Sequence, residues 1–248
     1  MTRKESKHNQ AVLAKDQNLF FSPQIEGQLC HFTEEESLHI IRALRKSKGD
    51  LIMVTNGNGC IYEAQIIDAN PKSCLAEVGT PVLHSVKKET GVHIAISLIK
   101  NTERFEWFVE KATEIGIDII TPLICARTEK IKINQERILK IMISSMKQSF
   151  RPWLPELNPL VSFKDFVLAE NNSQKFIADC SASEEDHLKV KIQKSSGICV
   201  LIGPEGDFTS TEKDLAKTHN YISVSLGANR LRTETAGIVA CHLGVLGL

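Results

Sequence analysis

The sequence has no net charge, no long hydrophobic run and no closely spaced pair of cysteines. Its 30 Lys and Arg balance 30 Asp and Glu, which excludes a polycation that binds nucleic acid through overall charge and leaves that role to local basic patches. Because nowhere do about 18 apolar residues follow one another, we expect no membrane-spanning helix. Residues 1–17 carry positive charge with no apolar run behind it, which argues against a signal peptide and predicts a flexible extension. We expect a cytoplasmic protein.

The seven cysteines are scattered along the chain. A metal site needs several thiolates or imidazoles close together, usually at short spacings such as CxxC, and no such spacing occurs. We therefore predict free thiols in a reducing compartment and no bound metal. A length of 248 residues allows one or two domains, and 42% hydrophobic and 24% charged residues are typical of a globular protein.

Residues 18–86 have the pattern of short strands and turns. The stretch NGNG at 56–59 separates two apolar segments and predicts a β-hairpin, because asparagine and glycine tolerate positive φ. Helical spacing of apolar residues predicts a helix over 34–48 that ends at Gly49. We expect a small β-barrel-like module, followed by a polar linker over 81–91.

Residues 90–248 instead alternate apolar strands with helices. The expected strands are HIAISLI, IDIITPLIC, KFIADC, ICVLIG and YISVSLG, and the expected helices cover 104–115, 134–149, 210–219 and 233–246. This alternation predicts an α/β domain with a mostly parallel sheet and helices on both faces. In such sheets ligands bind at the carboxyl ends of the strands.

One strand-to-helix loop reads Gly203-Pro-Glu-Gly206. Its two glycines allow the backbone to approach a ligand closely. Thr209 and Glu212 fit a capping box at the start of the next helix. A purely structural turn is an equal alternative. The loop has neither GxGxxG spacing nor the lysine of a phosphate-binding loop, which argues against dinucleotides and nucleoside triphosphates.

A second loop, 225–236, is unusually polar for a segment between a buried strand and an apolar helix. Arg230 and Arg232 lie beside a predicted helix amino terminus, where the helix dipole disfavours cations. An anionic ligand would compensate; the alternative is that Arg232 pairs with Glu234 or Glu205. A third loop, 178–181, gives a weaker signal of the same kind.

The strings LIGPEGDF and SLGANRLRTETA, in this order and spacing, resemble the carboxyl-terminal signature of the ribosomal RNA small subunit methyltransferase E family of the SPOUT superfamily. The resemblance extends over nearly the whole chain from Leu19. The other matching residues are Leu19, Phe20, Pro23, His39, Leu44, Arg45, Lys100, Arg104, Glu106, Trp107, Lys111, Glu114, Ile115, Gly116, Gln148, Ser149 and Arg151. Asp207 stands where many members have a third glycine.

The resemblance implies a homodimeric enzyme that uses S-adenosylmethionine to methylate N3 of one uridine in 16S (small-subunit) ribosomal RNA. It implies a PUA-like RNA-binding domain at 18–86 and a trefoil-knot SPOUT domain at 90–248. It also implies a cofactor pocket in which the loop 178–181 forms a third wall. The expected cofactor-binding residues are Leu201, Ile202, Gly203, Glu205, Gly206, Leu226, Gly227, Leu231, Arg232 and Thr233.

In that reaction the uracil N3 must lose a proton before it attacks, and negative charge spreads onto the flanking carbonyl oxygens. Arg232 is the expected catalytic residue, because a guanidinium beside the base stabilises this anion. It cannot be the base, since it stays protonated. Glu234 or Glu205 is the candidate proton acceptor, and a bracing role for either is the favoured alternative.

RNA binding needs local positive charge. The expected RNA-binding residues are Arg42, Arg45, Lys46, Lys100 and Arg104; a solvated charged surface is the alternative for the first three. Phe105 and Phe108 have core spacing, whereas Trp107 lies off that face. Two other functions stay open: methyl transfer to another RNA position such as a ribose 2′-hydroxyl, and RNA binding or ribosome assembly without catalysis.

Overall fold

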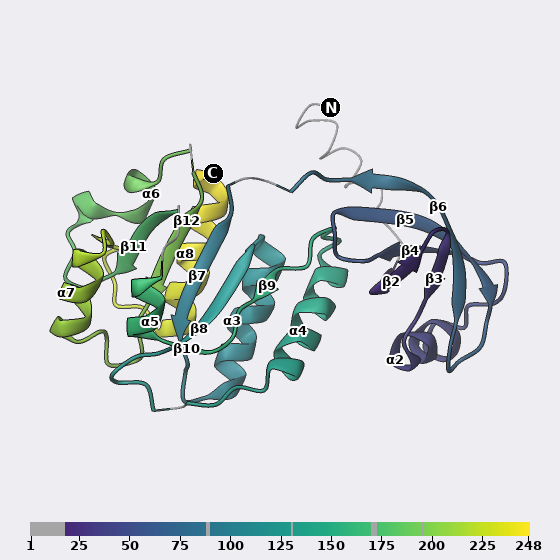
Figure 1. The fold of residues 1–248 in the computed structure, drawn as a ribbon, viewed down its shortest axis with the longest axis horizontal. Coiled ribbons are helices and arrows are strands. Elements are labelled where there is room, and N and C mark those ends of the chain that lie inside the picture. The colour runs from purple at the N-terminus through teal and green to yellow at the C-terminus, as the bar shows by residue number, and fades with distance from the viewer. Residues whose placement is uncertain (1–17, 88–89, 130, 170–172, 195) are drawn as a thin grey trace. The chain divides into compact units, whose positions relative to one another are not determined.

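The computed structural model describes residues 18–87, 90–129, 131–169, 173–194 and 196–248. The chain forms two compact units (Figure 1). Unit 1 comprises the residues up to Lys87 together with Ile143–Leu154, and unit 2 comprises Lys88–Met142 and Pro155–Leu248. The extension expected over residues 1–17 lies outside the described residues.

Unit 1 is built on one curled sheet of six strands in the order β1-β4-β5-β6-β3-β2. Strands β1 and β4 are parallel, and the other neighbours are antiparallel. Although β1 and β2 lie at opposite ends of this order, they follow each other directly in the chain, so the sheet must curl to bring its edges together. The strands are β1 (Leu19–Phe21), β2 (Gln24–Glu26), β3 (Leu29–His31), β4 (Leu51–Thr55), β5 (Cys60–Asp68) and β6 (Leu75–His84).

The hairpin predicted at 56–59 is confirmed, because it joins the antiparallel strands β4 and β5. The helix predicted over 34–48 is shorter: α2 (Glu34–Leu38) continues as one wider turn, η1 (His39–Ala43), and then ends. Arg45 adopts a left-handed φ of 54°, so the helix ends before Gly49. The linker expected from residue 81 also begins later, because β6 runs to His84.

The segment Ile143–Leu154 belongs to unit 1 although more than 50 residues separate it from the rest of that unit. Lys147 donates to both carboxylate oxygens of Glu36, at 2.9 and 2.8 Å. Phe150 packs against a buried cluster of the barrel: Leu19, Met53, Ile61 and Leu83. Sequence patterning did not indicate this addition to the module.

Unit 2 contains a seven-stranded sheet in which every pairing is parallel. The main order is β10-β8-β7-β12-β11-β13, and β9 pairs with β8. The strands are β7 (Val92–Ser97), β8 (Ile119–Ile124), β9 (Glu156–Leu157), β10 (Val161–Ser162), β11 (Gln174–Ala178), β12 (Ile198–Ile202) and β13 (Ile222–Val224). The predicted parallel α/β fold is confirmed.

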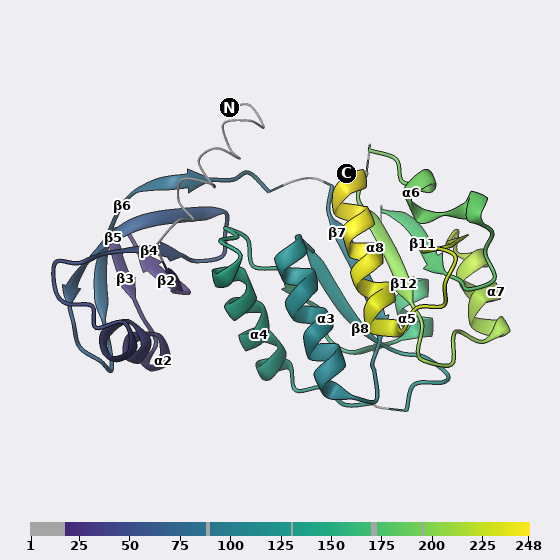
Figure 2. The same ribbon diagram turned by 180° about the vertical axis from the view of Figure 1, so that it is seen from behind.

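Helices cover both faces of this sheet. Figure 1 shows α5 and α7 in front of the sheet, and Figure 2 shows α3 and α8 on the opposite face. The helices are α3 (Thr102–Ile115), α4 (Gln135–Gln148), α5 (Phe163–Leu168), η2 (Glu184–Asp186), α6 (Leu188–Lys191), α7 (Ser210–Thr218) and α8 (Thr233–Gly247). The short elements β9, β10, α5, η2 and α6 were not expected from the sequence.

Helix α8 packs very closely against the sheet and α3. A Cβ atom added at Gly237 would lie 2.7 Å from the Phe108 ring, and one at Gly244 would lie 2.5 Å from Ile198 Cδ1. Real Cβ contacts are longer, so a side chain at either position would force the Phe108 ring or the end of the Ile198 side chain to move. This close packing fixes the amino terminus of α8 relative to the ends of the sheet strands.

His93 on β7 is half-buried, and its Nε2 atom lies 2.7 Å from Thr121 Oγ1. Burial lowers the pKa of His93 from 6.5 to about 4. The unfolded chain therefore binds a proton between these pH values that the folded chain does not. We expect the free energy of unfolding to fall by up to about 3 kcal/mol as the pH drops from 6.5 to 4. Urea unfolding across this range measures the effect. His93→Gln should flatten the dependence, and an unchanged slope in the variant would contradict this assignment.

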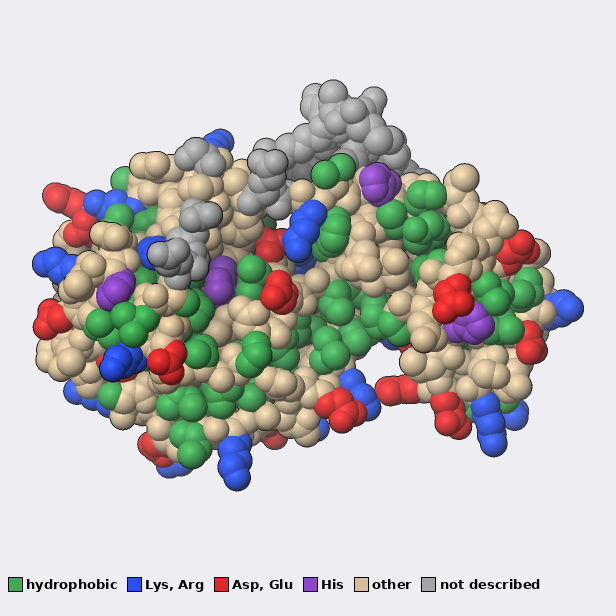
Figure 3. Space-filling view, in the orientation of Figure 1, with side chains coloured by type: hydrophobic (Ala, Val, Ile, Leu, Met, Phe, Trp, Pro, Cys, Tyr) green, Lys and Arg blue, Asp and Glu red, His purple; other side chains and the backbone are tan. Residues whose placement is uncertain are grey.

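Charged side chains of both signs are interspersed over the face seen in Figure 3, as the balanced composition suggests. All seven cysteines are free thiols. Within the described residues, no helix has the length and hydrophobicity needed to span a membrane. The same part of the chain contains no cluster of three His, Cys, Asp or Glu residues suited to a metal ion.

Candidate cofactor pocket at the carboxyl edge of the sheet

The three loops singled out in the sequence meet around one pocket of about 560 Å³. They follow β12, β11 and β13, which are neighbours in the sheet. Their residues lie together because parallel strands end at the same edge. The lining residues are Ala178, Asp179, Cys180, Ile202, Gly203, Pro204, Glu205, Asp207, Ser225, Leu226, Gly227, Ala228, Asn229, Arg230, Leu231, Arg232, Thr233 and Ala236.

The first wall is the loop after β12. Asp207 has a left-handed φ of 63°, a conformation that asparagine and aspartate tolerate better than most residues and that glycine adopts freely. Aspartate can therefore occupy this position, where the resemblance led us to expect a third glycine. The capping box is confirmed, because Thr209 and Glu212 exchange side-chain-to-backbone hydrogen bonds at the start of α7.

The second wall is the loop between β13 and α8. Gly227 has a φ of 131°, which side-chain-bearing residues rarely adopt. The backbone N–H of Gly227 donates to Ser225 Oγ at 3.2 Å, which stabilises the turn. At the end of the loop, Thr233 Oγ1 donates to the carbonyl oxygen of Gly203 at 2.9 Å and links the second wall to the first.

The third wall carries a buried carboxylate, Asp179, whose side chain is 8% exposed. Asp179 Oδ1 accepts hydrogen bonds from the backbone N–H and the hydroxyl of Ser181 and, at 2.7 Å, from Lys213 Nζ. Burial by itself raises the pKa of Asp179, but the hydrogen bonds from Lys213 and Ser181 outweigh it and hold the pKa below its usual value. Lys213 also donates to Asp207 at 2.9 Å and so joins the first and third walls.

Two arginines give the edge of the pocket positive charge. Arg230 and Arg232 are exposed, and Arg230 donates to the backbone carbonyl of Glu205 at 3.3 Å. Arg232 occupies the cap position before α8 without a side-chain capping bond. Over the described residues, neither Glu234 nor Glu205 forms an ion pair with it. The alternative of a structural ion pair for Arg232 therefore finds no support in the geometry.

Glu234 is buried and does not line the pocket. Its Oε1 atom lies 3.7 Å from Arg104 Nε, whereas Oε2 is buried with no hydrogen-bond partner in the described structure. A carboxylate so placed can orient Arg104 at the start of α3. The geometry thus favours bracing over proton transfer for Glu234.

The structure brings most of the expected cofactor-binding residues to the pocket and leaves two outside it. Leu201 is fully buried in the core beside Phe163 and Phe208. Gly206 contacts the Arg127 side chain, which donates to the Gly206 carbonyl oxygen. The residues that do line the pocket are Ile202, Gly203, Glu205, Leu226, Gly227, Leu231, Arg232 and Thr233. Asp179, a carboxylate directly after a buried strand, was not singled out individually.

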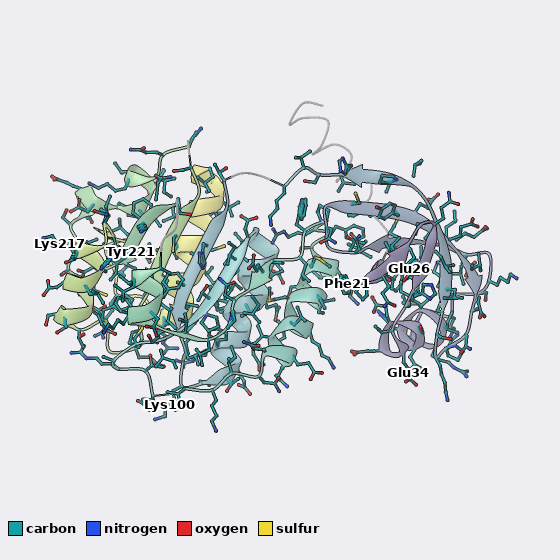
Figure 4. All side chains as sticks on the ribbon, in the orientation of Figure 1. Phe21, Glu26, Glu34, Lys100, Lys217 and Tyr221 are labelled. Carbon is teal, nitrogen blue, oxygen red and sulfur yellow. The ribbon has the colours of Figure 1, made fainter. Side chains whose placement is uncertain are left out.

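The expected RNA-binding residues fall in both units. Arg42 and Arg45 are exposed in unit 1, and Lys46 is half-buried there. In unit 2, Lys100 lies at the carboxyl edge of the sheet (Figure 4) and pairs with Glu129 at 2.7 Å. Arg104 follows at the start of α3.

The aromatic residues of α3 are buried or exposed as their helical spacing predicts. Phe105 and Phe108 are buried, which confirms their assignment to the core. Trp107 is 44% exposed and points away from that core.

Comparison with known proteins places these features in a family. Residues 86–244 match the RNA methyltransferase domain family, and residues 32–79 match the RNA methyltransferase PUA domain family. A ribosomal RNA small subunit methyltransferase E from Synechocystis sp. is 32% identical over 82% of this chain and 68% of its own length. The one from Rickettsia conorii is 28% identical over 87% of this chain and 88% of its own length.

Solved structures agree in fold. A probable rRNA-methyltransferase from Porphyromonas gingivalis has a TM-score of 0.81 and 34% identity, covering 90% of this chain and 95% of that protein. A protein from Legionella pneumophila, solved with the bound cofactor SAM, has a TM-score of 0.79 and 28% identity. The match covers 92% of this chain and 96% of that protein. The expectation of a methyltransferase fold with a PUA domain is confirmed.

Proposed function

Since this chain belongs to the ribosomal RNA small subunit methyltransferase E family, we propose that it methylates small-subunit ribosomal RNA in the cytoplasm with S-adenosylmethionine as methyl donor. The observation that carries this proposal is the pocket formed by the loops after β11, β12 and β13. Its position at the carboxyl edge of a parallel sheet is where ligands of such folds bind.

The residues of the pocket fit this cofactor. A volume of about 560 Å³ lies within the usual range for cofactor sites. The glycine-bearing loops expose backbone groups for the adenine edge, and Ile202, Leu226 and Leu231 supply apolar contact. The Legionella pneumophila protein, which binds SAM, is 28% identical to this chain. When bound, the sulfonium of S-adenosylmethionine makes its methyl group transferable without a metal.

We further propose N3 of a uridine as the methyl acceptor. Deprotonated uracil is an anion, and the exposed Arg232 guanidinium at the pocket edge stabilises it electrostatically. Glu205, which lines the pocket, is the better placed proton acceptor, because Glu234 is turned toward Arg104. The base has to be unpaired or flipped out of its helix to expose N3.

RNA positioning falls to basic residues outside the pocket. We propose that Arg42, Arg45 and Lys46 of the PUA domain bind phosphates, as the match to an RNA methyltransferase PUA domain suggests. Lys100 and Arg104 bind the RNA near the acceptor base, because they lie at the edge of the sheet that carries the pocket. Phosphate contacts of this kind position a substrate without reading its sequence.

Helix α8 supports the proposed homodimer. Apart from Cys241, its titratable side chains are Glu234 and His242, and the helix packs on β7, β12, α3 and α6. Leu246 near its end is 68% exposed. A mostly apolar helix is normally covered by protein over most of its surface. A second copy of the chain would cover the exposed end of the helix. The trefoil knot is proposed on a different ground, the resemblance to the SPOUT superfamily.

Nucleoside analysis tests the proposal. Small ribosomal subunits that lack the modification are incubated with the protein and S-adenosylmethionine, and the digested RNA is examined by mass spectrometry. We expect N3-methyluridine. A 2′-O-methylated nucleoside would contradict the proposed acceptor, and the absence of both methylation and cofactor binding would indicate RNA binding without catalysis.

A further inference from the structure

Asp179 lines the pocket directly after the end of β11. Strand β11, which it follows, lies between β12 and β13 in the sheet. The backbone N–H of Asp179 donates to the carbonyl oxygen of Val224, which fixes its position beside the end of β13. The loop that carries Asp179 therefore lies between the two glycine-bearing loops, and a ligand that contacts both of them comes close to Asp179.

The hydrogen bonds of Asp179 are unevenly divided between its two oxygens. Oδ1 accepts from the Ser181 backbone N–H at 2.9 Å, from the Ser181 hydroxyl at 2.7 Å and from Lys213 Nζ at 2.7 Å. In the described structure, Oδ2 has no hydrogen-bond partner from the protein. Since Asp179 lines the pocket, Oδ2 is the oxygen left for a ligand.

The charge of Asp179 is already balanced. Lys213 Nζ lies 2.7 Å from Asp179 Oδ1 and 2.9 Å from Asp207 Oδ2. A carboxylate held by an ammonium group needs no second cation, but its free oxygen remains a strong acceptor for neutral hydroxyl donors. The three bonds to Oδ1 also hold the carboxylate in one orientation, so little rotamer freedom is lost when a ligand binds.

We propose that Asp179 Oδ2 accepts hydrogen bonds from the ribose hydroxyls of the cofactor. This inference rests on the proposed function, in which the pocket binds S-adenosylmethionine. The ribose is the central part of that molecule, between the adenine and the methionine moiety, and Asp179 follows the middle one of the three strands whose loops line the pocket. Lys213 and Ser181 act as positioning residues for the carboxylate.

Calorimetric titration with ligand analogues tests the contact directly. The probes are S-adenosylhomocysteine, its 2′-deoxy and 3′-deoxy analogues, and 5′-methylthioadenosine, which keeps the ribose and lacks the amino acid. The protein is the full chain, either unaltered or carrying Asp179→Asn. Loss of a hydrogen bond to a charged acceptor should weaken S-adenosylhomocysteine binding about 10- to 100-fold.

We expect Asp179→Asn to weaken the binding of 5′-methylthioadenosine by the same factor as the binding of S-adenosylhomocysteine. At least one deoxy analogue should bind the unaltered protein about as weakly as S-adenosylhomocysteine binds the variant. The same analogue should bind the variant with little further loss of affinity. The matched control is Asp186→Asn, since Asp186 also pairs with a lysine and accepts from a serine, at 2.8 Å in each case, outside the pocket. The Asp186→Asn control should bind every probe with the same affinity as the unaltered protein.

Three results overturn the inference. The first is that the unaltered protein binds the deoxy analogues and S-adenosylhomocysteine with equal affinity, and this result needs no variant. Additive losses from the deoxy analogue and from Asp179→Asn would show that hydroxyl and carboxylate do not interact. A loss for S-adenosylhomocysteine but not for 5′-methylthioadenosine would assign Asp179 to the amino group instead. If the unaltered protein binds none of the probes, the proposed function itself fails.

Discussion

Replacing Arg232 with alanine should lower the turnover number about 100- to 1,000-fold, the usual cost of removing one group that stabilises developing negative charge. Arg232 is exposed at the pocket edge and forms no ion pair in the described structure, so its removal leaves no buried charge without a partner. The affinity for S-adenosylmethionine should change by less than about tenfold, since backbone groups and apolar contacts hold most of the cofactor. Single-turnover methylation and calorimetry measure the two effects separately.

Arg232→Lys is the matched variant for this experiment. Lysine keeps the positive charge but lacks the planar group that can donate to two sites at once, so only part of the rate should return. A kcat of Arg232→Ala close to that of the unaltered protein would remove Arg232 from the mechanism. A loss confined to cofactor affinity would make it a binding residue alone.

Gly227→Val should weaken S-adenosylmethionine binding at least about 10-fold while the protein remains folded. The φ of Gly227 is 131°, and a β-branched residue adopts such a conformation only at a cost of about 1–3 kcal/mol. To relieve this strain the turn has to move, which breaks the hydrogen bond between Gly227 and Ser225 and shifts the pocket wall. Calorimetry gives the affinity, and circular dichroism checks the fold.

Gly49→Val is the control for strain as such. Gly49 also has a positive φ, 95°, and open space around its Cβ position, but it lies in unit 1. We expect this variant to lose stability and to keep its cofactor affinity. Unchanged binding by Gly227→Val would mean that this turn does not contact the cofactor.

The pocket could be predicted because its parts are local in sequence and its assembly follows a general rule. Gly203, Gly206 and Gly227 mark loops that directly follow apolar strands, and parallel strands bring such loops to one edge. The hairpin at 56–59 and the capping box of Thr209 were predictable for a similar reason, since each depends on a few neighbouring residues.

What the sequence could not indicate depends on contacts between distant residues. Lys147 belongs to unit 1 through Glu36, which is 111 positions away. The helix over 34–48 ends early because Arg45 turns left-handed, and an arginine gives no local signal for that. Leu201 and Ile202 are adjacent in a strand and face opposite sides, so that only Ile202 reaches the pocket.

The roles of the acidic residues show the same limit. Glu234 looked like a candidate base from its place in the motif, but Arg104, 130 positions earlier in the sequence, lies 3.7 Å from its carboxylate. Asp179 gave little signal alone, and its importance comes from Lys213 and from the position of β11 between two other strands. Carboxylates acquire their chemistry from their neighbours, which sequence patterning does not reveal.

The most direct measurement is a crystal structure of the protein grown with S-adenosylmethionine. We expect electron density for the cofactor between the loops Gly203–Asp207 and Ser225–Thr233, with its methyl group facing Arg232. Density at another site, or a pocket that stays free of cofactor in crystals saturated with it, would contradict the proposed cofactor site.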